Sequence, residues 1–135
     1  PDRCARPCKR RRRPCGPASG YSGGYGSLLY ADAAEDYVTL PFYVAEAGNY
    51  NVVVGYKKTN DGGKVKVGTS TTTTGFTEYT TTTDLYYNGT AYSGVAYATR
   101  AFTVGKQYLR VRVTGKNTSS SGYRAYVDYI KLTKV

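Results

Sequence analysis

The stretch that decides the fold is "DYVTLPFYVAEAGNYNVVVGYKK", residues 36–58. Apolar side chains occupy every second position over residues 38–44 and again over residues 50–56. A period of two is typical of a β-strand that buries one face, and the "EAGN" at 46–49 has the composition of a turn. Pro41 cannot donate a ladder hydrogen bond, so the first strand is expected at the edge of a sheet or at a bulge.

The rest of the chain continues this pattern of short strands and turns. "NDGG" at 60–63 is a strong turn signal. The Thr-rich stretch 69–87 favours extended structure, but its two faces are alike and leave its register poorly specified. With about eight short strands and no convincing helix, we predict an all-β fold, an antiparallel β-sandwich of the jelly-roll type. The further expected strands are 27–33, 64–67, 93–104, 107–114 and 123–132.

The composition argues for one β-rich domain and against catalysis. Among 135 residues there are 16 Tyr, 3 Phe and no Trp, and Tyr suits pleated, half-wet surfaces. The absence of His removes Ser/His and Cys/His nucleophiles and the usual zinc ligands. No pair of carboxylates is recognisably placed for acid–base work. We therefore predict a protein that is not an enzyme, and the lack of an apolar run of about 18 residues predicts no membrane span.

The first 20 residues are interpreted as a basic head or linker, separate from a body over residues 21–135. Residues 1–15 hold seven basic residues and one acidic residue, which is +6 of the chain's net +10. Three interpretations stay open: a linker, a nucleic-acid-binding arm without interleaved aromatics, and a cross-linking tether. Three cysteines cannot all pair within one chain, so one is expected to pair between chains or stay free. They are Cys4, Cys8 and Cys15.

Residues 36–58, taken with "VTGKNTSSSGYRAYVDYIKL" at 113–132, resemble the carbohydrate-binding modules of families 6 and 35. The shared features are the A-G-x-Y-x-V pattern, a downstream G-x-N loop, a Gly-Tyr pair and a closing D-Y-I-x-L. "DLY" at 84–86 is similar to a piece of the related modules, and the resemblance covers about residues 20–133. It implies a secreted, non-catalytic jelly roll of the galactose-binding-domain-like class. It also implies that a polysaccharide or other glycan binds in a loop-edge cleft or on a concave face.

Asp128 is the candidate metal ligand. Strand alternation predicts that it shares the inner face with Ile130 and Leu132, where a carboxylate must be paired, hydrogen-bonded or metal-bound. The resemblance implies a structural Ca²⁺, held by this Asp and by an acidic residue of an E-A-E-type first strand. The Cys/Arg head occupies the place of that strand and has no such motif. The alternative is that Asp128 accepts backbone N–H bonds or pairs with Arg124.

Candidate sugar-binding residues are tyrosines and one amide near turns. A sugar ring stacks its C–H-rich face on a flat aromatic ring, while amides bind its hydroxyl groups. With 16 tyrosines in the chain, most are expected to be ordinary packing residues. Asn88-Gly-Thr and Asn117-Thr-Ser are also glycosylation sequons. The candidates are Tyr56, Tyr79, Tyr86, Tyr87, Tyr92, Asn117 and Tyr123.

Three functions compete on these observations. The first is a secreted carbohydrate-binding module. The second is a structural subunit of an extracellular fibre or surface layer with the same fold, in which the head mediates self-association, because a jelly roll without its first strand has an edge that the head or another chain could cover. The third, ranked last, is a capsid-like jelly roll whose basic arm binds nucleic acid.

Overall fold

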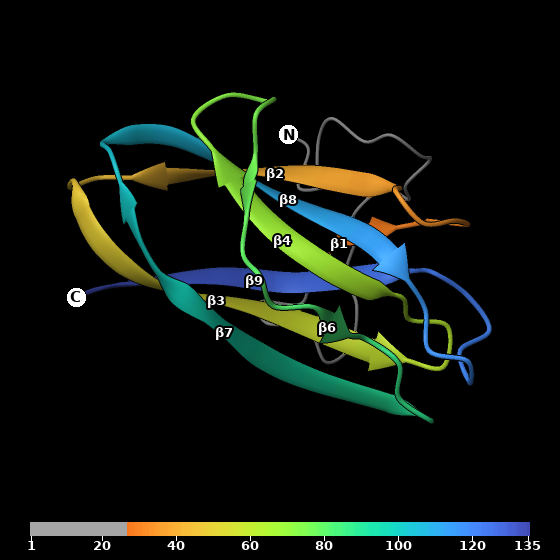
Figure 1. The fold of residues 1–135 in the computed structure, drawn as a ribbon. Helices are drawn as coiled ribbons and strands as arrows, with labels where there is room; N and C mark the ends of the chain where they lie inside the picture. The colour runs from red at the N-terminus through yellow and green to blue at the C-terminus, as the bar shows by residue number, and fades with distance from the viewer. Residues whose placement is uncertain (1–26) are drawn as a thin grey trace.

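Two antiparallel sheets pack face to face in a β-sandwich (Figure 1). The structure is a computed structural model that describes residues 27–135, so the predicted head, its three cysteines and the start of the predicted body lie outside the described residues. Within that range there is no helix, which confirms the predicted all-β jelly roll. The strands are β1 (Ser27–Leu29), β2 (Tyr37–Val44), β3 (Gly48–Thr59), β4 (Lys64–Ser70), β5 (Thr77–Glu78), β6 (Thr83–Asp84), β7 (Thr90–Phe102), β8 (Gly105–Gly115) and β9 (Ala125–Lys134).

The sheet order places the strands of the fold-deciding stretch in different layers. One sheet has the order β1-β9-β3-β7 and the other β2-β8-β4-β5, with β6 also paired to β4. β2 is therefore an edge strand, which confirms the prediction made from Pro41, whose exposed ring lies opposite Tyr108. The connection at residues 45–47, where a turn was predicted over residues 46–49, thus carries the chain from one sheet to the other.

Strand alternation builds the core between the layers. Val38 pairs with Val111 and both are buried, as are the adjacent partners Leu40 and Leu109. Each such side chain contributes about 1.5–3 kcal/mol when fully buried. The other fully buried aliphatic side chains are Leu29, Val52, Val54, Val65, Val67, Leu85 and Val113.

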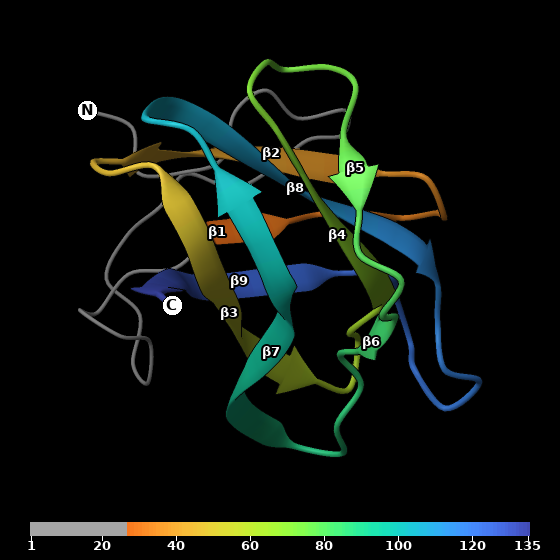
Figure 2. The ribbon, with the colours of Figure 1, turned by 60° about the vertical axis from the view of Figure 1, so that its left-hand side comes forward.

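The Thr-rich stretch is held by a few anchors rather than by a long ladder. It forms only the two-residue strands β5 and β6, both beside β4 (Figure 2). Thr83 lies in the core, where its hydroxyl is 3.0 Å from that of Tyr97, which in turn lies 2.7 Å from the hydroxyl of Tyr56. This chain of hydroxyls links β6 to β7 and β3, and so specifies a register that the Thr repeat leaves open.

The last strand departs from the predicted alternation at Asp128. On the neighbouring strand β3, Tyr56 pairs with Val127, whereas Gly55 pairs with Tyr129. Asp128 is therefore an extra residue on β9, which is the definition of a β-bulge.

The bulge interrupts the alternation from which Asp128 was predicted to share the face of Ile130 and Leu132, so the shared face stays a prediction. Val127, just before the bulge, is buried in the core, while Ile130 and Leu132, beyond it, also pack against the core. Since the extra residue shifts the alternation by one, the inward positions change from odd to even numbers. Asp128 stands at the shift and is half-buried.

Candidate functional site

Several connections meet at one end of the sandwich, which we call the loop end: residues 30–32, 60–63, 84–88 and 116–124. Figure 1 shows the β3–β4, β6–β7 and β8–β9 connections gathered there. Backbone bonds join them, since the Gly63 N–H donates to the Arg124 carbonyl at 2.9 Å and the Leu85 N–H to the Gly63 carbonyl at 2.9 Å. The β3–β4 turn is thus clamped between the other two connections.

Side chains reinforce this clamp. The buried Ser120 donates its hydroxyl to the Gly62 carbonyl at 2.7 Å. Asn117 donates its amide to Asp84 at 2.9 Å and accepts the Ser119 N–H at 2.9 Å. Asp84 also accepts the Tyr86 N–H at 3.0 Å. The loop end is therefore preorganised, which lowers the entropic cost of binding a ligand.

A charged pair lies in a hollow at this end. Arg124 donates to Asp61 at 2.8 Å, Asp61 also accepts the Thr59 hydroxyl, and the guanidinium stacks 4.4 Å from the ring centre of Tyr30. Carboxylate and guanidinium groups are the groups that bind sugar hydroxyls most strongly, because charged hydrogen bonds are about twice as strong as neutral ones. The hollow measures about 450 Å³ and is lined by Ala31, Asp32, Asp61, Ser121, Gly122, Tyr123 and Arg124.

The structure brings four of the seven predicted sugar-binding residues to the loop end. Tyr123 lines the hollow, with the Lys116 ammonium 5.8 Å from its ring centre. Tyr86 is half-buried and Tyr87 is 48% exposed, and Asn117 lies in the clamp described above. Tyr92 differs from these four because it lies on β7, paired with a residue of β3.

Tyr56 and Tyr79 lie in the core and present no ring to a ligand. Tyr56 is 0% exposed and Tyr79 4% exposed. Burial raises the pKa of the Tyr56 phenol well above its usual value, with a further rise from the neighbouring Tyr97, and burial also raises the pKa of Tyr79. Tyr79 packs between Tyr97, with ring centres 5.3 Å apart, and the guanidinium of Arg100 at 3.7 Å.

The Asp61–Arg124 pair is a feature that the candidate list lacked. Asp61 belongs to the "NDGG" turn, and Arg124 had been considered only as a partner for Asp128. The two residues are 63 positions apart and meet only because Gly62 and Arg124 bridge in the folded chain. A charged residue inside a strong turn signal was the sequence clue to the Asp61 side of this pair.

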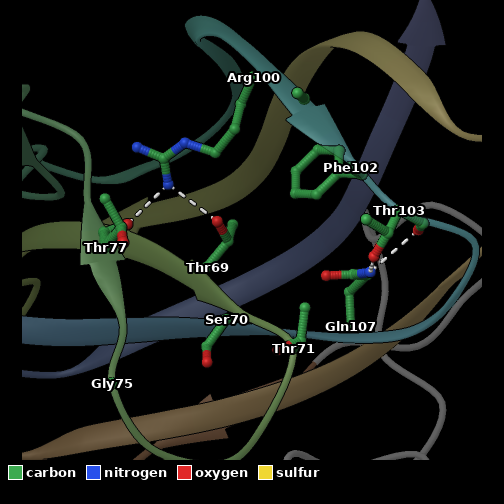
Figure 3. Close-up of a pocket in the computed structure, with 10 residues that line it drawn as sticks. Thr69, Ser70, Thr71, Gly75, Thr77, Arg100, Phe102, Thr103 and Gln107 are labelled. Atoms are coloured by element: carbon green, nitrogen blue, oxygen red, sulfur yellow. Dashed lines mark hydrogen bonds between the residues drawn. The ribbon is translucent and has the colours of Figure 1, made fainter.

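A second hollow, of about 340 Å³, lies at the opposite end, between the loop after β4 and the β7–β8 turn (Figure 3). Arg100 reaches across it and donates to the Thr69 hydroxyl at 2.8 Å and to the Thr77 carbonyl at 2.6 Å. Gln107 donates its amide to Thr103. The one aromatic ring in its lining, Phe102, is buried, so this hollow offers polar groups without an open ring face.

The predicted calcium site is represented by Asp128 alone. Within residues 27–135, no three side chains of the His, Cys, Asp or Glu type gather where they could hold a metal. Calcium takes six to eight oxygen ligands, which carboxylates, carbonyl groups and water supply together. The first-strand acid implied by the resemblance would fall in the head, outside the described residues, so calcium stays a prediction. No helix among residues 27–135 could span a membrane.

Comparison with known proteins shows which solved structures share this fold. No family model matches the sequence, and no curated protein matches it significantly. A family 35 carbohydrate-binding module from an environmental isolate superposes with a TM-score of 0.60 at 14% identity, over 90% of this chain and 85% of that one. The family 35 module from Clostridium thermocellum gives 0.56 at 14%, over 94% and 90%. The fold is therefore a jelly roll of the family 6/35 type.

Enzymes match only through a part of their length. Xanthan lyase from Paenibacillus superposes with a TM-score of 0.84 at 22% identity over 97% of this chain, which spans about 12% of that enzyme. The mannanase of Podospora anserina matches over 26% of its chain. A family 36 module of a xylanase from the hindgut metagenome of Trinervitermes trinervoides, like the two family 35 modules, matches over most of both chains, with a TM-score of 0.52 at 18% identity over 94% and 92%.

Proposed function

We propose that this chain is a non-catalytic carbohydrate-binding module that holds a glycan at its loop end. The observation that carries the proposal is the position of Tyr123 beside the Asp61–Arg124 pair in one preorganised hollow. A ring face for the sugar's C–H groups and charged groups for its hydroxyls are the two parts that sugar recognition requires.

The geometry favours binding over chemistry. Arg124 and Asp61 neutralise one another at 2.8 Å, and the guanidinium is further fixed against Tyr30. Each group still has hydrogen-bonding capacity for a ligand, because a guanidinium has five N–H donors and a carboxylate about four lone-pair sites. The Asp61 carboxylate is already engaged by Arg124, whereas hydrolysis of a glycosidic bond uses a pair of carboxyl groups as acid and base.

The proposed partner is a polysaccharide outside the cell. The modules with this fold occur alone or as parts of enzymes whose names include xanthan lyase, mannanase, galactanase and xylanase. We therefore choose xanthan, β-mannan, β-1,3-galactan and xylan as probes, and propose a secreted location on the same grounds.

Affinity electrophoresis through gels that contain each polysaccharide tests the proposal. The wild-type chain is expected to be retarded by at least one of the four, and Tyr123→Ala to lose most of that retardation, about tenfold in affinity. Tyr43→Ala is the matched control. Tyr43 is 72% exposed and lies on β2 of the five-stranded sheet, whereas Tyr123 precedes β9 of the four-stranded sheet. Equal retardation of Tyr123→Ala and wild type would place the site elsewhere, and no retardation in any gel would refute the function.

Self-association through the head remains a separate prediction. It concerns Cys4, Cys8, Cys15 and the rest of residues 1–20, which lie outside the described residues. Light scattering on the full chain, with and without reductant, tests it. A monomer under both conditions contradicts it, and a dimer lost on reduction supports an inter-chain disulfide.

A further inference from the structure

The chain contains two dipeptides in which a glycine follows a side chain that can react with the backbone, Asn88-Gly89 and Asp61-Gly62. In such a pair the glycine nitrogen can attack the carbonyl carbon of the preceding side chain, because glycine has no Cβ to hinder the approach. Asn88-Gly89 lies in the connection from β6 to β7 and Asp61-Gly62 in the β3–β4 turn, so both lie at the loop end (Figure 1). The fold holds the two dipeptides very differently.

The reactive groups of Asp61-Gly62 are engaged by the fold. Arg124 donates to one oxygen of the Asp61 carboxylate at 2.8 Å, and the Thr59 hydroxyl donates to the other. Gly62 is buried, and its N–H donates to the Thr59 carbonyl at 3.3 Å. Since a paired carboxylate is a poor electrophile and a hydrogen-bonded N–H is a poor nucleophile, this dipeptide is protected in the folded chain.

Asn88-Gly89 lacks this protection. Both residues are exposed, and no hydrogen bond from the described part of the chain holds the Asn88 side-chain amide. Gly89 has a φ of +123°, which L side chains rarely adopt, and a Cβ there would come no closer than 3.4 Å to its nearest neighbour, the Tyr87 ring. The fold therefore requires the glycine for its backbone conformation and leaves the space around it open.

We propose that Asn88 is a site of spontaneous chemical modification, at which the side-chain amide is converted to a carboxylate. The Gly89 nitrogen loses its proton and forms a bond to the Asn88 Cγ, while the bond from Cγ to Nδ2 breaks and ammonia leaves. Water then opens the resulting cyclic imide at either of its two carbonyl groups. The sum of these steps consumes one water and releases one ammonia, so no oxidant or reductant takes part.

The two modes of ring opening give different backbones. One restores the ordinary chain with an aspartate in place of Asn88. The other leads the main chain through the side chain as isoaspartate, which lengthens the backbone by one carbon atom. Either product is ionised at neutral pH, because a carboxyl group of this kind has an ordinary pKa below about 4. Both products therefore place a new negative charge beside Tyr87, which is 48% exposed.

The isoaspartate form also disturbs the start of β7, because the connection is fixed at both ends to Thr59. The Tyr87 N–H donates to the Thr59 carbonyl at 2.9 Å, and Thr90, the first residue of β7, pairs with the same Thr59. Only Asn88 and Gly89 lie between these two anchors, so an extra main-chain atom there must displace one anchor. We expect the Thr59–Thr90 pair to open first, since strand ends have the least local stability.

Peptide mapping of the full chain after incubation in warm, mildly alkaline buffer tests the site. The chain is produced in a host that does not attach N-linked glycans, because the Asn88-Gly-Thr sequon uses the same amide nitrogen. The peptide that contains Asn88 is expected to take on the mass of its aspartyl form at least about tenfold faster than the peptides that contain the other asparagines. These are Asn49, Asn51, Asn60 and Asn117. Asn88→Gln is the matched control, because its longer side chain keeps the amide but closes the corresponding ring far more slowly.

Two outcomes of the peptide map decide on the site. If Asn88 reacts no faster than the other asparagines, the proposed site is wrong. Isoaspartate at Asp61 is expected only when the same incubation is made in urea, which releases the carboxylate from Arg124 and Thr59. Isoaspartate that forms at Asp61 in the folded chain as fast as at Asn88 would overturn the argument from protection.

Melting curves test the effect on β7. The isoaspartate fraction, separated by chromatography, is expected to melt about 2–5 °C below Asn88→Asp, which carries the same charge on an ordinary backbone. Equal melting temperatures of the two proteins would contradict the displacement of an anchor at Thr59.

Discussion

The outer faces of the two sheets use their polar side chains in different ways. On the five-stranded face, Arg112 donates to both oxygens of Glu78 at 2.8 and 2.9 Å and to Glu35 at 2.7 Å, and Arg110 adds a contact to Glu78 at 3.2 Å. On the four-stranded face, the Tyr129 ring lies against Gly55 and Gly94, and the Lys57 ammonium lies 5.2 Å from the ring centre of Tyr126.

This difference distinguishes charged residues that stabilise the fold from charged residues that bind a ligand. The guanidinium of Arg110 lies 4.8 Å from the ring centre of Phe76 and 5.6 Å from that of Tyr37, so aromatic side chains also close around the charged groups of the five-stranded face. A surface whose donors and acceptors bind one another is stabilised but has little left for a ligand. We therefore expect mutations on the five-stranded face to change stability and those in the loop-end hollow, such as Tyr123→Ala, to change binding.

Glu78→Ala is expected to have the largest effect. It leaves Arg110 and Arg112, whose side chains are mostly buried, without their shared carboxylate. Removing one partner of such a pair strands the other charge, and we expect a loss of about 3 kcal/mol in the free energy of unfolding, with unchanged affinity for glycan. Urea denaturation measures the first and affinity electrophoresis the second. A binding defect in folded Glu78→Ala would break the proposed division between this face and the loop end.

Gly55→Ala is expected to come next. Its methyl group would overlap the Tyr129 ring, which must then lift off the sheet. We expect a loss of about 1–2 kcal/mol in the free energy of unfolding from this overpacking, measured by urea denaturation. The matched control is Gly115→Ala, where the added Cβ has no neighbour within 4 Å and φ is negative. Equal behaviour of the two variants would argue against the close contact of the Tyr129 ring with Gly55.

Acidification is expected to weaken the same network without a mutation. The hydrogen bond from Arg112 holds the pKa of Glu78 below its ordinary value of 4.5. The folded state therefore binds this proton more weakly than the unfolded state, so the stabilisation is complete above pH 4.5 and is lost as the pH falls through the lowered pKa. Glu78→Gln is expected to lack this part of the pH dependence. Identical profiles of melting temperature against pH for the two proteins would contradict the assignment.

Calcium is expected to produce the smallest effect. If Asp128 and an acid of the head hold Ca²⁺, then millimolar calcium should raise the melting temperature of the full chain by about 2–5 °C relative to excess chelator. Asp128→Asn should abolish that rise, while Asp32→Asn should keep it. If the melting temperature of the wild type is the same with calcium and with chelator, the prediction of a calcium site is wrong.

Much of the candidate site could be predicted from local sequence, and some of it could not. The period of two that marked residues 50–56 already placed Tyr56 on the same face as Val52 and Val54, so its burial agrees with the pattern although it had been a candidate for sugar binding. The loop before β9 was expected to hold Asn117 near a cleft edge, and the structure places Asn117 against Asp84 at the loop end and Tyr123 in the hollow, yet Asp61 was read only as part of a turn.

By itself, the sequence determined the strands and their buried faces, because alternation is a local property that each strand carries along its own length. Only the tertiary structure decided which strands became neighbours, and with them the meeting of Asp61 with Arg124 and the covering of Gly55 and Gly94 by Tyr129. It also decided the bulge at Asp128, which depends on the register against β3 and not on any residue next to it in the chain. Register couples segments that lie tens of residues apart, so the site is a property of their packing.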